Sequence, residues 1–228
     1  MRTGSVQHAM FRSSLKIAAT MAPAHVFGWL DPFQRDYRRC GIRPCERFHV
    51  RPRTLRIESH GALGEMKTLL LLRHGKSSWN DPTLDDHERP LNERGRRDGP
   101  RIGELLREYG LIPDLVVSSD AVRAQLTAEA VAEAAGYAGE ILLDHRLYLA
   151  SPADMLVLLQ AGRETAETIM IVGHNPGLEE LVEQLTGERQ HLPTAALAQI
   201  VLPIDRWRDL ELSTRGTLLG HWRPEELT

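Results

Sequence analysis

Three short motifs contain the residue types that phosphate chemistry needs. Arg73-His74-Gly75 directly follows the apolar run KTLLLL, Arg123 stands in SSDAVRAQ, and His174 stands in VGHNP. Two guanidinium groups offer planar pairs of N–H donors that match the oxygens of a phosphate dianion. A neutral imidazole is a competent nucleophile toward phosphorus, and a second imidazole can donate to an oxygen or transfer a proton. The motifs therefore predict a site that binds and attacks a phosphate group.

The alternation of apolar runs with helical patterns predicts how these motifs meet. Buried strands are expected at residues 67–72 and 113–119, with further strands at 140–144, 167–175, 196–203 and 216–224. Helices are expected at residues 91–110, 120–136, 151–162 and 176–187. This order requires a mostly parallel sheet covered on both faces, a three-layer α/β/α sandwich of the α/β class. Ligands bind beyond the carboxyl ends of such strands, where the three motifs stand.

Local signals predict where two of these helices begin and end. Asn92 is expected to cap the helix at 91–110, Pro100 to kink it or start its second half, and Gly110 to end it. Asp120 is expected as the N-cap of the following helix and Gly136 as its end.

Each motif also has a simpler explanation. A single histidine at a strand end is more often structural than catalytic, and Arg123 could lie on a solvated helix face. The sequence GHNP could be only a strand-to-helix turn, since Gly, Asn and Pro are turn residues. The three motifs fall at equivalent positions of the predicted sheet, and this coincidence favours one shared pocket.

The three motifs, taken in order, resemble the histidine phosphatase superfamily, which has a phosphoglycerate-mutase-like fold. The resemblance is carried by RHG after an apolar strand, by SSDAVRAQLTAEAV and by VGHNPGLEELV, and it covers about residues 66–220. Within the superfamily the chain is particularly similar to the short bacterial SixA-type protein-phosphohistidine phosphatases, which begin much as MKTLLLLRHGKSSW does.

The resemblance implies a role for each residue of the motifs. His74 would attack phosphorus in line and carry the phosphoryl group until water hydrolyses it. Arg73 and Arg123 would hold the phosphate oxygens and stabilise the charge of the transition state. His174 would donate a further hydrogen bond to the phosphoryl group.

Two more residues, Ser77 and Asn80, match polar positions that often line the substrate side of the site in relatives. No cofactor and no metal are expected, because the two arginines supply the positive charge. Zinc could bind the two histidines of the motifs in principle, but the adjacent guanidinium groups would repel it.

The general acid is the part of the family pattern that this chain lacks. Many relatives that cleave phosphate esters have a glutamate after the third strand, whereas this stretch, LLDHRLYLASP, has Asp144 too early and Tyr148 further on. Three acids of the loop NDPTLDDHERP could reach over the pocket, or could simply be solvated: Asp85, Asp86 and Glu88.

The missing glutamate and the short connections favour a substrate class. An alkoxide leaving group needs a proton, whereas imidazole leaves phosphohistidine more easily. No long insertion is available as a lid, so an open pocket that admits a protein side chain is expected. Phosphoglycerate mutation needs a site closed to water and is disfavoured. We therefore expect a phosphatase for protein phosphohistidine, with a small-molecule phosphate ester phosphatase or an inactive phosphate-binding module as alternatives.

The first 65 residues differ from the rest of the chain. They carry about six more positive than negative side chains and no sustained periodicity. Met66 could be the natural start, so that residues 1–65 are an over-extended translation; they could also be a disordered extension, mildly similar to a transit peptide, or a small module. Cys40 and Cys45 form a lone C-x4-C pair, a weak zinc signal. The catalytic domain is predicted over residues 66–228.

Charge and hydropathy limit the partners of that domain. Its side chains carry a net negative charge, which argues against nucleic acid as the main partner. No apolar run approaches the roughly 20 residues needed to span a membrane, so no membrane association is expected. A cytoplasmic enzyme acting on a phosphorylated protein side chain or small substrate is expected, and the oligomeric state is left open.

Overall fold

The structure, a computed structural model, describes residues 66–227. Residues 1–65 and Thr228 lie outside the described residues, and with them all three interpretations of the N-terminal segment and both cysteines. The boundary of the catalytic domain at residue 66 therefore stays a prediction.

The apolar run after Met66 forms a central strand, β1 (Lys67–Arg73). Successive side chains of a strand point to opposite faces of the sheet. Leu69 and Leu71 accordingly join one hydrophobic core cluster, while Leu70 and Leu72 join another, and all four are fully buried. A strand buried on both faces needs a layer of helices on each side.

Six strands form one sheet in the order β3-β2-β4-β1-β5-β6. The strands other than β1 are β2 (Leu115–Ser118), β3 (Ile141–Leu143), β4 (Thr168–Gly173), β5 (Leu197–Leu202) and β6 (Thr217–Trp222). The pairs β1–β4, β2–β4 and β2–β3 are parallel, whereas β5 and β6 add antiparallel pairs at one edge. The prediction of a mostly parallel sheet is confirmed.

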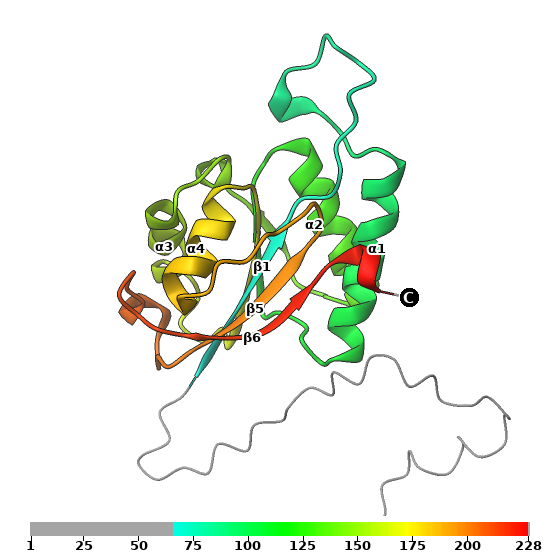
Figure 1. Cartoon of the computed structure of the whole chain (residues 1–228). Coiled ribbons are helices and arrows are strands. Elements are labelled where there is room, and N and C mark those ends of the chain that lie inside the picture. The colour runs from blue at the N-terminus through cyan, green and yellow to red at the C-terminus, as the bar shows by residue number, and fades with distance from the viewer. Residues whose placement is uncertain (1–65, 228) are drawn as a thin grey trace, which may run out of the picture. The chain divides into compact units, whose positions relative to one another are not determined.

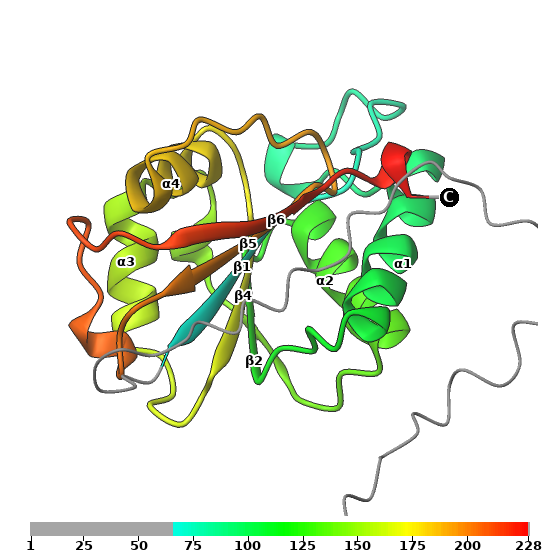
Figure 2. The ribbon, with the colours of Figure 1, turned by 60° about the horizontal axis from the view of Figure 1, so that its bottom comes forward.

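Four α-helices cover the two faces of this sheet. The helices α1 (Glu93–Glu108) and α2 (Val122–Ala135) pack on the face that carries Leu70 and Leu72. The helices α3 (Pro152–Gln160) and α4 (Gly177–Thr186) pack on the opposite face. Figure 2 shows the sheet between these two helix pairs. The three-layer α/β/α sandwich is confirmed.

The predicted helix ends are right in three cases and wrong in one. The Asn92 side chain accepts a hydrogen bond from the Gly95 amide, and Gly110 after α1 and Gly136 after α2 both have the left-handed conformation that ends a helix. Pro100 lies inside α1. Asp120 is not the N-cap of α2: that position is Ala121, and no side chain caps it. The Asp120 carboxylate instead accepts hydrogen bonds from two histidines, so the capping prediction fails because better donors lie close by.

The connections after the strands lie at the carboxyl edge of the parallel strands. The loop between β1 and α1 extends beyond the end of β1 and contains a short 3-10 helix, η2 (Asp86–Glu88) (Figure 1). A second 3-10 helix, η3 (His145–Leu147), follows β3. These two short helices bring polar side chains to the edge where the three motifs end.

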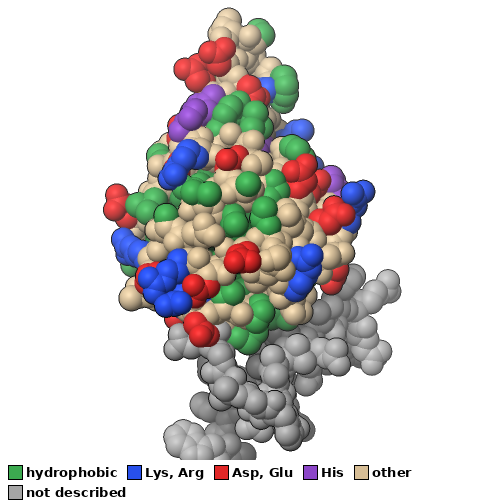
Figure 3. Space-filling model, turned by 90° about the vertical axis from the view of Figure 1, so that its left-hand side faces the viewer, with side chains coloured by type: hydrophobic (Ala, Val, Ile, Leu, Met, Phe, Trp, Pro, Cys, Tyr) green, Lys and Arg blue, Asp and Glu red, His purple; other side chains and the backbone are tan. Residues whose placement is uncertain are grey.

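The outer surface is mixed in character. Figure 3 shows one face of the molecule, on which acidic, basic and hydrophobic side chains are interspersed without a large patch of a single charge. Within residues 66–227, no helix has both the length and the apolar character needed to cross a membrane.

Candidate active site

The register of two neighbouring strands brings the two motif histidines together. β1 and β4 are parallel, and Arg73 lies opposite Gly173. The next residue on each strand is therefore a histidine, and parallel strands are only about 4.8 Å apart. The His74 amide donates to the Gly173 carbonyl over 3.1 Å, and the ring centroids of His74 and His174 are 4.9 Å apart.

His74 is held as a neutral imidazole with one free nitrogen. Its side chain is buried, and its Nδ1 lies 2.7 Å from the Gly75 carbonyl oxygen. A carbonyl only accepts, so Nδ1 carries the proton and Nε2 keeps its lone pair. Burial lowers the pKa of His74 to about 4, and the positive charges of Arg123 and Arg73 lower it in the same direction. At neutral pH, Nε2 is thus available as a nucleophile.

Two glycines allow the chain after His74 to pass close to α1. A Cβ on Gly75 would lie 3.1 Å from the Gly95 carbonyl oxygen and 3.2 Å from a Leu91 methyl group, tighter than ordinary packing. The Gly75 amide also donates to Thr127 Oγ1 over 2.9 Å. This link fastens the segment after β1 to the helix that carries Arg123.

Arg73, the residue before His74, has one buried side-chain donor that stays unpaired within residues 66–227. Its Nη1 donates to the Leu192 carbonyl over 2.8 Å, which fixes the direction of the guanidinium. Among residues 66–227, its buried Nε has no hydrogen-bond partner. Burial lowers the pKa of Arg73, while the nearby Glu179 carboxylate opposes that effect. A buried unpaired donor is costly unless an acceptor such as a phosphate oxygen reaches it.

Arg123 comes from the first turn of α2, and its guanidinium is held by the β1–α1 loop. Its Nη2 donates to Asp86 Oδ2 over 2.8 Å, and its Nη1 donates to the Asp86 carbonyl. Only 6% of the Arg123 side chain is exposed, whereas 55% of the Asp86 side chain is exposed. The exposed carboxylate therefore occupies the donors that a phosphate would need.

His174 is also neutral, but both of its ring nitrogens already have partners. Arg123 Nη2 lies 3.4 Å from Nδ1, and Ser119 Oγ lies 3.0 Å from Nε2. A guanidinium only donates, so Nδ1 accepts and the proton is on Nε2. Burial lowers the pKa of His174 to about 3, helped by His74 and Arg123. The predicted donation from His174 to a phosphoryl group therefore requires Nδ1 to gain a proton.

The sequence does not decide whether the acids of the β1–α1 loop reach the pocket or lie in solvent. Asp86 reaches the site, where Tyr148 Oη donates to Asp86 Oδ2 over 2.9 Å. Burial tends to raise the pKa of Asp86, but the hydrogen bond from Tyr148 and the charge of Arg123 outweigh it and keep that pKa below its usual value. Burial and the Asp86 carboxylate raise the pKa of Tyr148. The pair is thus a carboxylate and a protonated phenol.

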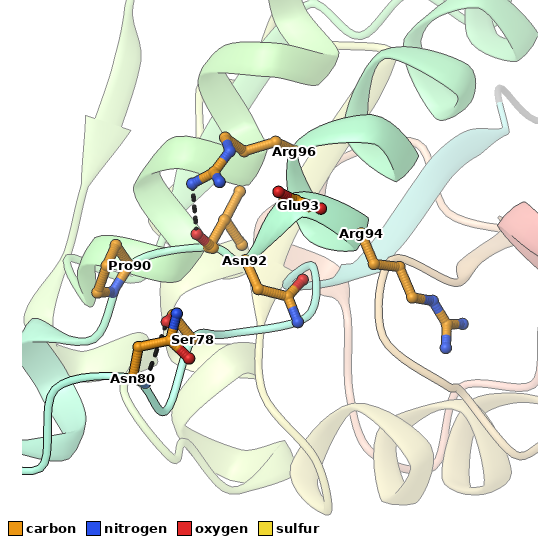
Figure 4. A pocket seen from close by; sticks show the side chains of 8 residues that line it. Ser78, Asn80, Pro90, Asn92, Glu93, Arg94 and Arg96 are labelled. Atoms are coloured by element: carbon orange, nitrogen blue, oxygen red, sulfur yellow. Dashed lines mark hydrogen bonds between the residues drawn. The ribbon is translucent and has the colours of Figure 1, made fainter.

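The other two predicted site residues lie further along the β1–α1 loop. Ser77 is half-buried and pairs with Leu91 in an isolated β-bridge. Asn80 is exposed and lines a surface hollow of about 550 Å³ with residues that include Asn92 and Arg94 (Figure 4). None of the four motif residues lines this hollow. Substrate contact by Ser77 and Asn80 stays a prediction.

Comparison with known proteins identifies the family to which this arrangement belongs. A family model described as "Histidine phosphatase superfamily (branch 1)" matches residues 69–148, which contain Arg73, His74 and Arg123. An uncharacterised chloroplastic protein of Arabidopsis thaliana is 33% identical over 170 residues, covering 71% of this chain and 77% of that protein. The chain belongs to the histidine phosphatase superfamily.

Solved structures of the superfamily extend the match beyond residue 148. A candidate phosphohistidine phosphatase SixA from Agrobacterium tumefaciens is 31% identical, with a TM-score of 0.59 over 69% of this chain and 98% of that one. A protein histidine phosphatase SixA complexed with tungstate has a TM-score of 0.61 over 71% of this chain and 99% of that one; at 22% identity it supports the fold alone.

Phosphoglycerate mutases also match part of this chain. The mutase of Clavibacter michiganensis is 42% identical, but only over 76 residues, which is 30% of its length. The match to the mutases is therefore partial, whereas the match to the SixA structures covers nearly their whole chains. As a member of the histidine phosphatase superfamily, this protein is a hydrolase of that type.

Proposed function

We propose that this protein hydrolyses phosphohistidine on other proteins, through a phosphohistidine intermediate on its own His74. The main support is the neutral His74 ring, whose Nδ1 is tied to the Gly75 carbonyl while Nε2 stays free. The positive charges of Arg123 and Arg73 act on the His74 ring, and the centroid of the His174 ring lies 4.9 Å from its own. This combination suits nucleophilic attack on a dianion and stabilisation of the charge that develops in the transition state.

Substrate binding begins with an exchange of anions on Arg123. The Asp86 carboxylate accepts from Arg123 in the resting site, and a phosphoryl dianion would take its place. The unpaired Nε of Arg73 would donate to a second oxygen. Charge-assisted, bidentate hydrogen bonds favour the phosphoryl group over a single carboxylate.

The first chemical step transfers the phosphoryl group to His74. Its Nε2 forms a bond to phosphorus as the bond from phosphorus to the substrate nitrogen breaks, and the electron pair goes to the leaving imidazole. Tyr148 Oη and solvent are the proton sources near the leaving group. His174 stabilises the transferred group once Nδ1 is protonated, which the added negative charge favours because it raises the pKa of an imidazole.

The second step returns the enzyme to its resting state. Water attacks phosphorus, the bond to His74 Nε2 breaks, and inorganic phosphate leaves. Asp86 is ionised and has been released from Arg123, so it is the base that accepts the proton of the attacking water. Asp86 then releases that proton to solvent, and the return of its carboxylate to Arg123 helps to displace the product.

The acid–base groups favour phosphohistidine over phosphate esters as substrate. Asp86 is a carboxylate at neutral pH and Tyr148 is a weak acid, so neither provides the strong proton donor that an alkoxide leaving group needs. An imidazole leaving group needs less assistance. The resemblance to structures named as phosphohistidine phosphatases supports the same choice.

A substrate panel tests this proposal. The full chain is incubated with a phosphorylated histidine-containing phosphotransfer domain, with a sugar phosphate and with para-nitrophenyl phosphate, and phosphate release is measured. We expect kcat/KM for the protein substrate to exceed that for the sugar phosphate by about 100-fold or more, equivalent to roughly 3 kcal/mol of transition-state stabilisation. Equal or faster hydrolysis of the sugar phosphate would instead assign the enzyme to small phosphate esters.

His74→Asn is the matched control for the intermediate. Acid-labile phosphate should be trapped on the wild-type chain and be absent from this variant. Trapping on both chains would show that His74 is not the nucleophile.

The location of the enzyme is a separate proposal. The cytoplasm is supported by the absence of cysteine from residues 66–228, because such a domain needs no oxidising compartment. The Arabidopsis relative is named as chloroplastic, which makes an organelle the alternative. Fractionation of the source cells, with detection by an antibody to the catalytic domain, distinguishes the two.

A further inference from the structure

A second cluster of ionisable side chains lies beside the phosphate pocket and takes no part in the proposed reaction. His87 in η2, Asp120 before α2 and His145 in η3 each offer one ligand atom, and these three atoms lie within 4.8 Å of one another. His87 Nε2 is 2.8 Å from Asp120 Oδ1, and His145 Nδ1 is 2.9 Å from Asp120 Oδ2. We call these three residues the rim cluster.

We propose that the rim cluster binds a divalent transition-metal cation of the zinc type. Two imidazole nitrogens and a carboxylate oxygen are ligands that zinc takes in proteins, commonly as three protein groups with a fourth position for water. The same set of donors is a poor match for magnesium or calcium, which prefer oxygen ligands throughout.

The geometry of the rim cluster needs little change to hold such an ion. Ligand atoms about 2.0–2.2 Å from a tetrahedral zinc lie about 3.3–3.6 Å from each other. The three ligand atoms lie within 4.8 Å of one another, so a modest adjustment brings them to this spacing. The two short hydrogen bonds of the metal-free cluster use different oxygens of Asp120. The His145 side chain is 76% exposed and can move, while His87 and Asp120 are partly buried and define the site.

Charge and proton positions are also compatible with a cation. Burial tends to raise the pKa of Asp120, but hydrogen bonds from His87 and His145 outweigh it and keep that pKa below its usual value. Because a carboxylate only accepts, the nitrogen of each imidazole that faces Asp120 carries a proton in the metal-free protein. A bound metal replaces those protons, which move to the other ring nitrogen or to solvent.

Asp120 does not perform the helix-capping role that its position before α2 suggests. Instead it joins two segments far away in the chain, one 33 residues earlier and one 25 residues later. A cation there would fasten the β1–α1 loop, visible beyond the end of β1 in Figure 1, to the start of α2 and to η3.

An exposed pair elsewhere in the molecule provides the control. His191 Nδ1 lies 2.9 Å from Glu179 Oε1, and the His191 side chain is 72% exposed. This pair reproduces one half of the rim cluster, with the same kind of hydrogen bond but a single imidazole. It should not hold a metal ion.

The test is a titration of the full chain with Co²⁺, which reports its coordination by visible absorption, and with Zn²⁺ by calorimetry. All chains carry Cys40→Ser and Cys45→Ser, so that thiolates do not contribute. We expect one ion per chain and the intense absorption of a four-coordinate site. Zn²⁺ should also raise the melting temperature, since an ion that binds only the folded state stabilises it.

Variants decide which residues hold the ion. Asp120→Asn and His145→Asn should each weaken Zn²⁺ binding about 10-fold or more and remove the shift in melting temperature. His191→Asn should bind as the parent does. His145 is exposed, so its variant should fold even if the Asp120 variant does not.

Two results would overturn the proposal. One is equal affinity of the parent and the rim-cluster variants for Zn²⁺. The other is loss of binding only when His74 is replaced by Asn, which would assign the ion to the paired imidazoles of the phosphate pocket.

Discussion

Two pairs of imidazoles lie near each other in this molecule, and their surroundings give them different chemistry. In the phosphate pocket, His74 and His174 are buried among guanidinium groups, and burial lowers their pKa values to about 4 and about 3. In the rim cluster, His87 and His145 are more exposed and share the carboxylate of Asp120. Tyr148 stands between the pairs, with its ring centroid 5.3 Å from that of His174 and 4.9 Å from that of His87.

The contrast shows what an imidazole needs in order to act as a nucleophile rather than as a ligand. Burial, helped by the guanidinium groups, keeps His74 neutral, and those groups also repel metal ions and attract a phosphate dianion. The Asp120 carboxylate between His87 and His145 instead attracts cations and repels phosphate. Histidine side chains in these two neighbouring clusters are therefore suited to partners of opposite charge, a phosphate dianion in one and a metal cation in the other.

The largest expected effect comes from removing the nucleophile. His74→Asn should lower kcat on a phosphorylated phosphotransfer domain by about 1,000-fold or more, because no other residue can carry the phosphoryl group in the same position. The measurement is single-turnover phosphate release. His191→Asn, a change of an exposed histidine, is the control and should stay within about twofold of wild type. A similarly small loss of kcat in both variants would show that His74 is not the nucleophile.

The next largest effect concerns the charge around the pocket. Arg123→Gln should lower kcat/KM by about 100-fold, since one preorganised donor to the transition state is lost. It should also weaken inhibition by inorganic phosphate and raise the pKa of His74, because the Arg123 charge is one cause of its depression. The control is Arg146→Gln, since Arg146 is an exposed arginine paired with Asp144. Unchanged phosphate inhibition in Arg123→Gln would contradict the proposed binding mode.

The dependence of stability on pH tests the lowered pKa of His74 in the buried pair. The unfolded chain protonates His74 near pH 6.5, whereas the folded chain does so only near pH 4. The free energy of unfolding should therefore fall as the pH decreases from 6.5 to 4, by about 3 kcal/mol from this residue. Urea unfolding at several pH values should show a smaller decline in His74→Asn. Identical declines in both proteins would mean that the fold does not lower the pKa of His74.

A smaller effect is expected at the residue between the two pairs. Tyr148→Phe removes the hydrogen bond to Asp86, which should raise the pKa of that carboxyl and lower kcat by a few-fold. The loss should be greater for a sugar phosphate than for phosphohistidine, because the poorer leaving group depends more on proton transfer. Rates for the two substrates that fall by the same factor would exclude Tyr148 from proton transfer.

The smallest effect is expected for the rim cluster without metal. Asp120→Asn should change the free energy of unfolding by about 1 kcal/mol or less in the presence of a chelator, since partly exposed ion pairs contribute little. Urea unfolding with and without Zn²⁺ measures this change. A large loss of stability in the presence of chelator would show that the cluster stabilises the fold through its hydrogen bonds, without a metal ion.

The sequence was sufficient to predict the sheet and to bring the motif residues to one edge. Strand periodicity and the rule that ligands bind at carboxyl ends located His74, His174 and Arg123 without any knowledge of their contacts. The register Arg73–Gly173 then explains why the two rings meet. These features follow from local pattern and topology, which a sequence carries directly.

The contacts of the β1–α1 loop cannot be predicted by the same reasoning. The loop NDPTLDDHERP has no periodicity, so nothing in it distinguishes Asp86, which reaches Arg123, from the neighbouring acids. The sequence predicts Asp120 as a helix cap because aspartate commonly has that role just before a helix. Its real partners, His87 and His145, are distant in the chain, and only the folded loop reveals them.

The short helix η2 contacts both regions through consecutive residues. Asp86 competes with phosphate for Arg123, and the next residue, His87, belongs to the rim cluster. Holding one of these side chains in place restrains the other, because they share one turn of backbone. Binding of zinc at the rim cluster and binding of substrate at Arg123 would then be thermodynamically linked. Each ligand would change the affinity of the protein for the other ligand by the same factor.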